Sequence, residues 1–193
     1  MKRLMLAGLL LLPSTAAAQA KFFGVTAGAS LSDYTDDWGG INTHDRWGFT
    51  GGFIAGIRTS NYMAIAIEPS FTQMGGGDLR ADYLEFPLTF GGVARSGDGS
   101  MRYGGYTGIT GAFKLSCSEP ANLPVADVCD NMKGSAWFIP LGLRILRRTN
   151  QTTFIGIDVK YDIPLGSSHE VFDANQRSWA FRLVMVKGAV PGM

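Results

Sequence analysis

Residues 152–165 read TTFIGIDVKYDIPL and alternate between two kinds of side chain. On one face the side chains are bulky and apolar: Ile155, Ile157, Val159, Tyr161 and Ile163. On the other face they are small or charged: Gly156, Asp158, Lys160 and Asp162. Alternation with period two is typical of a β-strand whose faces meet different surroundings. The segment therefore predicts a strand with one large apolar face and one charged face.

The same pattern recurs in seven further segments: 23–31, 47–58, 63–73, 82–93, 101–114, 135–147 and 177–187. The links between these strands alternate in length. Short turns span 59–61, 96–100 and 148–151, whereas the links 32–46, 74–81, 115–134 and 166–176 are longer. This layout is typical of an outer-membrane barrel. We therefore predict an all-β, eight-stranded antiparallel up-and-down transmembrane β-barrel with short periplasmic turns and longer outer loops.

The two faces distinguish a membrane barrel from a soluble one, which would place its bulky side chains inside. An eight-stranded barrel has little more interior than side chains can fill, so the small and charged face suits the lumen. The bulky face is then predicted to contact lipid: Phe53, Ile65, Leu141, Ile157 and Leu183. Trp47, Trp137 and Trp179 begin inward-running strands on this face, and they predict an outer aromatic girdle.

The first twenty residues predict export. Lys2 and Arg3 precede the apolar run 4–12, and Ala18 and Ala20 supply the small residues that a signal peptidase reads. We expect residues 1–20 to be a cleaved signal peptide and residues 21–193 to form one barrel domain. With the barrel pattern, this predicts the cell outer membrane of a Gram-negative bacterium as the location.

Charge and cysteine content narrow the possible partners. Without Lys2 and Arg3, 15 of the 17 basic residues remain against 16 acidic ones, so nucleic acid is not an expected partner. Cys117 and Cys129 are the only cysteines, and both fall in the longest predicted outer link. In an exported protein they are expected to form a disulfide.

Several short motifs carry a resemblance to a known family. They are the stretches 24–28, 31–32, 48–52, 67–69, 83–88 and 156–161, which read GVTAG, LS, GFTGG, IEP, YLEFPL and GIDVKY. Together they resemble the PorT-like outer-membrane β-barrel domain family. The resemblance implies a small outer-membrane barrel without an assigned catalytic site. Such a barrel is expected to have membrane lipid and the barrel-assembly machinery as partners, whereas the sequence names no surface ligand.

Charged residues on the small face are expected inside the lumen. The predicted lumen charge network comprises Glu68, Glu85, Arg144, Asp158, Lys160, Asp162 and Arg182, and Arg58 and Arg102 point inward as well. Buried charges persist when they are paired. One interpretation is therefore a salt-bridge network that fills the lumen, and the other is a charged, porin-like pathway for ions or small solutes.

No motif predicts catalytic, cofactor-binding or metal-binding residues. His44 and His169 both fall in predicted outer links, where Ser168 is merely a sequence neighbour of His169. The cluster of Asp33, Asp36 and Asp37 lacks the spacing of a calcium loop. The glycine run 75–77 lacks the lysine of a phosphate loop.

We therefore expect a non-enzymatic outer-membrane protein without a cofactor. It would present surface loops on a plugged barrel, in a cell-envelope or surface-interaction role. The alternatives are a narrow channel for ions or small solutes and a lipid-modifying outer-membrane enzyme.

Overall fold

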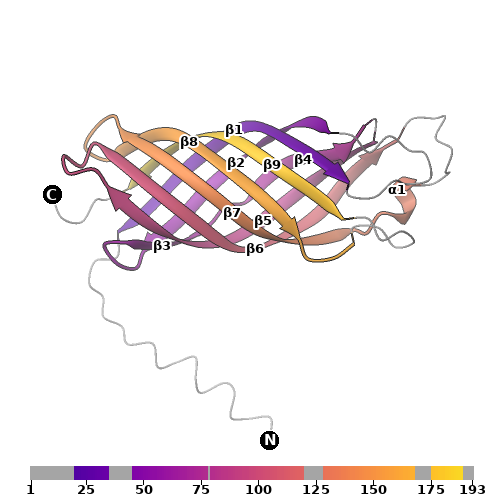
Figure 1. Ribbon diagram of the computed structural model, residues 1–193, viewed down its shortest axis with the longest axis horizontal. Coiled ribbons are helices and arrows are strands. Elements are labelled where there is room, and N and C mark those ends of the chain that lie inside the picture. Colours follow the sequence, from indigo (N-terminus) through magenta and orange to yellow (C-terminus); the bar gives the residue numbers. More distant parts are fainter. Residues whose placement is uncertain (1–19, 35–44, 78, 120–127, 168–174, 189–193) are drawn as a thin grey trace, which may run out of the picture.

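The chain folds into a single antiparallel sheet that closes into a barrel, as the computed structural model shows (Figure 1). The structure describes residues 20–34, 45–77, 79–119, 128–167 and 175–188. The strands are β1 (Lys21–Tyr34), β2 (Arg46–Arg58), β3 (Met63–Ile67), β4 (Ser70–Gly76), β5 (Leu79–Arg95), β6 (Met101–Ser118), β7 (Ser135–Arg148), β8 (Thr153–Pro164) and β9 (Gln176–Gly188). The described residues also include a single short helix, α1 (Val128–Asn131), which is far too short to cross a membrane.

Strand order around the ring follows the chain. Strands that follow one another in the chain pair with each other, except β3 and β4, which each pair with β2 and β5. β1 pairs with both β2 and β9 and so closes the barrel. The predicted up-and-down barrel is thereby confirmed. The pairing between β1 and β9 runs from Phe22 opposite Gly188 to Tyr34 opposite Gln176.

The predicted third strand, 63–73, is divided into β3 and β4 by Glu68 and Pro69. Proline has no amide hydrogen for the ladder, and this dipeptide interrupts the strand. Its backbone still bonds to both neighbours, because Phe53 N donates to Pro69 O and Glu68 N donates to Pro87 O. The nine strands therefore occupy eight positions around the ring, with β3 and β4 sharing one between β2 and β5.

One of the predicted long links is wrong. Instead of a loop over 74–81, β4 and β5 continue pairing until Gly76 lies opposite Leu79. Gly77 takes a left-handed φ of 55°, which glycine adopts without steric cost and which permits a tight turn. Three consecutive glycines, Gly75 to Gly77, weaken the alternation that marks a strand, so the sequence pattern does not predict this pairing.

The two ends of the barrel differ. The links after β2, β5 and β7 lie at one end, together with Lys21 and Gly188, and we call this the turn end. The opposite end carries α1 and is called the loop end (Figure 1).

The outer surface of the barrel is apolar. Phe53 and Leu183 are each 67% exposed, and Ile65, Leu141 and Ile157 are exposed as well. The side chains that alternate with them point into the barrel and include many buried polar and charged groups. In a soluble protein such a surface would be unusually large, whereas lipid covers it in a membrane barrel.

Candidate functional site

The interior of the barrel has three layers, which follow one another from the loop end to the turn end. An apolar plug occupies the loop end, buried ion clusters occupy the middle, and a cavity lies at the turn end. The middle layer is the candidate functional site, because its charged groups extend across the lumen.

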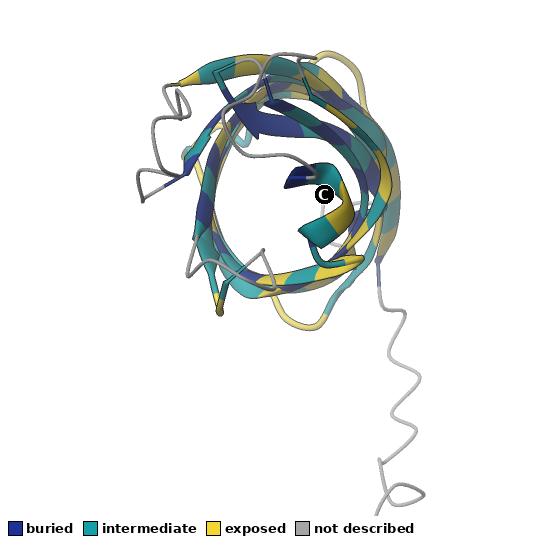
Figure 2. Ribbon diagram, turned by 90° about the vertical axis from the view of Figure 1, so that its right-hand side faces the viewer, coloured by how far each residue is buried: buried dark blue, intermediate teal, exposed yellow. Residues whose placement is uncertain are grey.

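The apolar plug is built around α1. Val128 and Met132 are buried against inward-facing strand residues: Tyr34, Met74, Leu79, Ala81, Tyr83, Ala112 and Phe138. Figure 2, which views the barrel from the loop end, shows α1 within the outline of the ring. The segment thus folds back over the barrel mouth, where its apolar side chains escape water.

Two kinds of cross-link hold this segment in place. Cys117 at the end of β6 and Cys129 in α1 form a disulfide with a Cα–Cα distance of 5.6 Å. Lys114 Nζ donates to the carbonyl oxygens of Cys129 at 2.9 Å and of Met132 at 2.7 Å. Both contacts tie α1 to β6, so the plug is anchored to the barrel wall.

The first ion cluster consists of two carboxylates and two guanidinium groups. Arg144 Nη2 lies 3.0 Å from Glu68 Oε1, and Arg144 Nε lies 3.1 Å from Asp158 Oδ1. Arg182 bonds to the same two acids, with Nη2 at 3.2 Å from Glu68 Oε2 and Nε at 2.9 Å from Asp158 Oδ2. Tyr106 donates its hydroxyl to Asp158 at 2.9 Å. The cluster has no net charge.

The second ion cluster lies further along β8, toward the loop end. Lys160 Nζ lies 3.0 Å from Glu85 Oε2 and 2.8 Å from Asp162 Oδ2. Ser70 Oγ donates to Glu85 at 3.2 Å, and Ser178 Oγ donates to Asp162 at 3.1 Å. The alternation of β8 creates both clusters, because Asp158, Lys160 and Asp162 share its inward face.

The first cluster crosses the barrel from wall to wall. In the eight-position ring, the position shared by β3 and β4, which carries Glu68, lies opposite β8, which carries Asp158. Arg144 on β7 and Arg182 on β9 bridge these two acids. Charges this deeply buried require close partners, since desolvation is costly. The pairing therefore fixes the first cluster in the lumen, where it reaches from one wall to the other.

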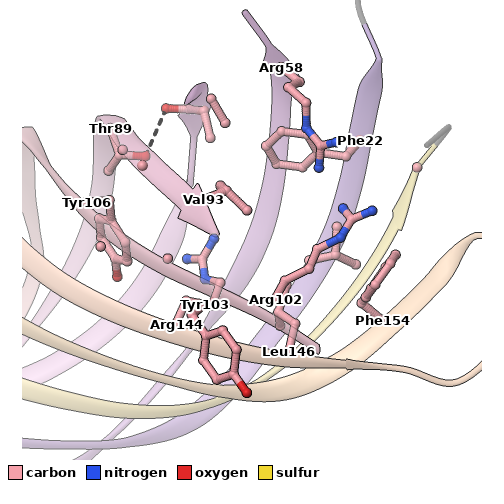
Figure 3. Close-up of a pocket in the computed structure, with 18 of the residues that line it drawn as sticks. Phe22, Arg58, Thr89, Val93, Arg102, Tyr103, Tyr106, Arg144, Leu146 and Phe154 are labelled. Atoms are coloured by element: carbon pink, nitrogen blue, oxygen red, sulfur yellow. Dashed lines mark hydrogen bonds between the residues drawn. The ribbon is translucent and has the colours of Figure 1, made fainter. Parts of the chain in front are cut away.

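A cavity of about 110 Å³ lies between the first cluster and the turn end of the barrel. The part of the cavity next to the first cluster is lined by Glu68, Thr89, Tyr106 and Arg144. The part nearer the turn end is lined by Phe22, Arg58, Arg102, Leu146, Phe154 and Val186. Figure 3 shows Arg58 and Arg102 extending toward one another in this space. The cavity ends at the ion cluster rather than continuing to the loop end.

The structure brings all seven predicted lumen charges into the interior, but in two groups without a direct ion pair between them among the described residues. Tyr106 was missed as a member of the first group. The apolar plug was not predicted either, and the signal that could have indicated it is the presence of two large residues, Tyr83 and Phe138, on the small face of their strands.

The three predicted girdle tryptophans lie on the outer surface, with Trp47 63%, Trp137 52% and Trp179 44% exposed. Leu31 on β1 pairs with Trp47 on one side and Trp179 on the other, so these two share a height. Trp179 also packs against Tyr161, with ring centroids 4.5 Å apart and ring planes tilted by 34°.

Several predicted residues lie outside the described part of the chain: Ala18, Asp36, Asp37, His44, Ser168 and His169. Ala20 is described, and it is buried. Among the described residues, no group of three or more His, Cys, Asp or Glu side chains is arranged to hold a metal ion.

Comparison with known proteins identifies the fold. No protein-family profile matches the chain, and no curated protein matches its sequence. Solved structures do match. OprG from Pseudomonas aeruginosa superposes with a TM-score of 0.59 at 10% identity, covering 88% of this chain and 96% of OprG. Neisserial surface protein A gives 0.55 at 12% identity, covering 86% of this chain and 96% of that protein. The outer membrane protein AlkL superposes with a TM-score of 0.50 at 9% identity, covering 91% of this chain and 93% of AlkL.

These matches establish that the chain has the fold of small outer-membrane β-barrels. The fold and the apolar outer surface support the predicted location in the cell outer membrane. The resemblance to the PorT-like family has no matching profile behind it and stays a prediction.

Proposed function

We propose that this chain is a non-enzymatic outer-membrane β-barrel protein that presents its loops at the cell surface on a barrel closed to solutes. In this proposal its role is in the cell envelope or in surface interactions, and its partners are membrane lipid and the barrel-assembly machinery. The wall-to-wall ion cluster of Glu68, Arg144, Asp158 and Arg182 is the observation that carries the proposal.

Two barriers in series support a closed lumen. The first ion cluster bridges opposite walls, the second joins β5 to β8, and the plug of Val128 and Met132 covers the loop end. An ion passing the first barrier would have to displace paired guanidinium and carboxylate groups, whose separation in a low-dielectric interior is costly. It would then meet the mostly apolar plug, where giving up hydration is costly.

The narrow-channel alternative is favoured by the cavity at the turn end. Its lining extends from Ala20 and Gly188 at the barrel end to Glu68 and Arg144, so the turn-end part of a pathway is present. A channel would require the ion clusters to rearrange and the plug to withdraw. Measurement of solute flux separates the two functions.

Surface presentation of the loops is tested by epitope insertion. One variant carries a short epitope between Gly166 and Ser167 at the loop end, and the matched variant carries it after Gly97, in an open turn at the turn end. We expect antibody to label intact cells that express the first variant. Cells that express the second variant should be labelled only after they have been permeabilised. Labelling of intact cells through the Gly97 epitope would contradict the proposed orientation.

A further inference from the structure

The cavity at the turn end contains two cations without acidic partners. Neither the Arg58 nor the Arg102 guanidinium makes an ion pair or hydrogen bond with any residue that the structure describes. Arg58 Nη1 and Arg102 Nε are both buried from solvent without a partner. Elsewhere in the lumen, the described arginines Arg144 and Arg182 are each paired with carboxylates.

The surroundings of this arginine pair are electrostatically positive. Arg95 on β5 lies directly opposite Arg102 on β6 in the antiparallel ladder. The acid that lines the same cavity, Glu68, already accepts from Arg144 and Arg182. Keeping two partly buried cations side by side is unfavourable without an anion, so the cavity is complementary to negative charge.

The remaining wall of the cavity is apolar and aromatic. The guanidinium carbon of Arg102 lies 3.9 Å from the centroid of the Phe154 ring. Phe22 lies beside Arg58 in Figure 3, and Leu146 and Val186 complete this wall. A small number of polar groups in a mostly apolar concave site is the usual composition of a small-molecule site.

We propose that this cavity binds a small amphipathic organic anion. Its acidic group would lie between Arg58 and Arg102, whose planar forks suit a carboxylate or phosphate. Its apolar body would contact Phe22, Phe154 and Leu146. The site lies at the turn end, away from the surface loops, and does not depend on whether the lumen conducts.

Binding is tested with the protein in phosphatidylcholine nanodiscs, using 3-phenylpropionate as the probe in isothermal titration calorimetry. We expect saturable binding that weakens about tenfold for each of Arg58→Ala and Arg102→Ala, because each removes a charge-assisted hydrogen-bond donor. Arg147→Ala is the matched control: it removes the same charge from an exposed side chain near the same end, outside the cavity, and is expected to bind normally. A heat-dependent shift in gel mobility verifies that each variant is folded.

Two comparison ligands separate the contributions. The neutral alcohol 3-phenylpropanol should bind at least tenfold more weakly, and inorganic phosphate alone should also bind more weakly. The proposal is overturned if the alcohol or phosphate matches 3-phenylpropionate, or if the Arg58→Ala, Arg102→Ala double variant binds like the wild type. A second titration in nanodiscs that contain phosphatidylglycerol shows where the bound anion comes from. Weaker binding of 3-phenylpropionate in these nanodiscs would mean that the anionic lipid competes for the cavity and that the membrane supplies the anion.

Discussion

Arg144 joins the two acids that face each other across the lumen. Its Nη2 lies 3.0 Å from Glu68 Oε1, although 76 positions separate the two residues in the chain. The same guanidinium donates from Nε to Asp158 Oδ1 at 3.1 Å. A single side chain thereby links opposite walls of the barrel.

Loss of this brace should destabilise the barrel. Arg144→Ala leaves Glu68 and Asp158 to share Arg182, so one buried negative charge is uncompensated. We expect the free energy of unfolding to fall by about 3–5 kcal/mol, the range for breaking a buried ion pair. Urea unfolding in lipid vesicles measures this change. Arg147→Ala is the control, and equal midpoints for the two variants would show that the cross-lumen contacts do not stabilise the barrel.

The second ion cluster should tolerate loss of one acid. Lys160 has two carboxylate partners, Glu85 and Asp162, and Glu85→Gln keeps an oxygen that can accept from it. We expect a change within about 1 kcal/mol, comparable to one hydrogen bond. The matched isosteric change Asp158→Asn leaves two arginines against Glu68 alone, and we expect it to cost several times more. The reverse order in unfolding experiments would refute the charge balance described for the two clusters.

The apolar outer surface makes a separate prediction about the membrane. Leu141→Arg places a charge on the lipid-facing side of β7 and should cost about 2–4 kcal/mol if this position is near the bilayer midplane. Tyr62→Arg, in the exposed turn between β2 and β3, should cost about 0–1 kcal/mol. Refolding into vesicles and measuring both unfolding free energies tests this depth dependence. Similar values at the two positions would argue against a lipid-covered belt.

The disulfide should stabilise the plug more than the barrel. Closing the loop between Cys117 and Cys129 restricts the unfolded chain by about 3 kcal/mol in the entropy model. In a Cys117→Ser, Cys129→Ser variant, we expect faster amide hydrogen exchange in α1 and little change in the β7–β8–β9 strands. Alkylation of envelope protein without reductant provides the direct check. Two labelled thiols in that mass spectrum would mean that the disulfide does not form in the cell.

The sequence predicted the strands well because each has one face toward lipid and one toward the lumen. The alternation of Ile157 with Asp158 is enough to orient β8. Period-two patterns do not report pairing register, so they could not divide the seven lumen charges into two clusters. That division depends on which residues lie opposite one another, such as Arg144 opposite Asp158.

Features without periodicity escaped prediction. The plug residues Val128 and Met132 belong to a link that has neither strand nor long-helix patterning. Their burial depends on the tertiary position of the disulfide and of Lys114. The unpaired state of Arg58 and Arg102 was equally hidden, because an inward-facing charge in a sequence does not reveal whether an acid lies within reach.

Ion flux through the purified protein in lipid vesicles tests most directly whether the lumen is closed. Vesicles carry a halide-quenched dye, flotation verifies incorporation of the protein, and an open porin is the positive control. We predict that halide entry in wild-type vesicles matches that in protein-free vesicles, because the ion clusters and the plug block the lumen in series. Halide entry that rises in proportion to the amount of incorporated wild-type protein would contradict a closed barrel and favour the channel.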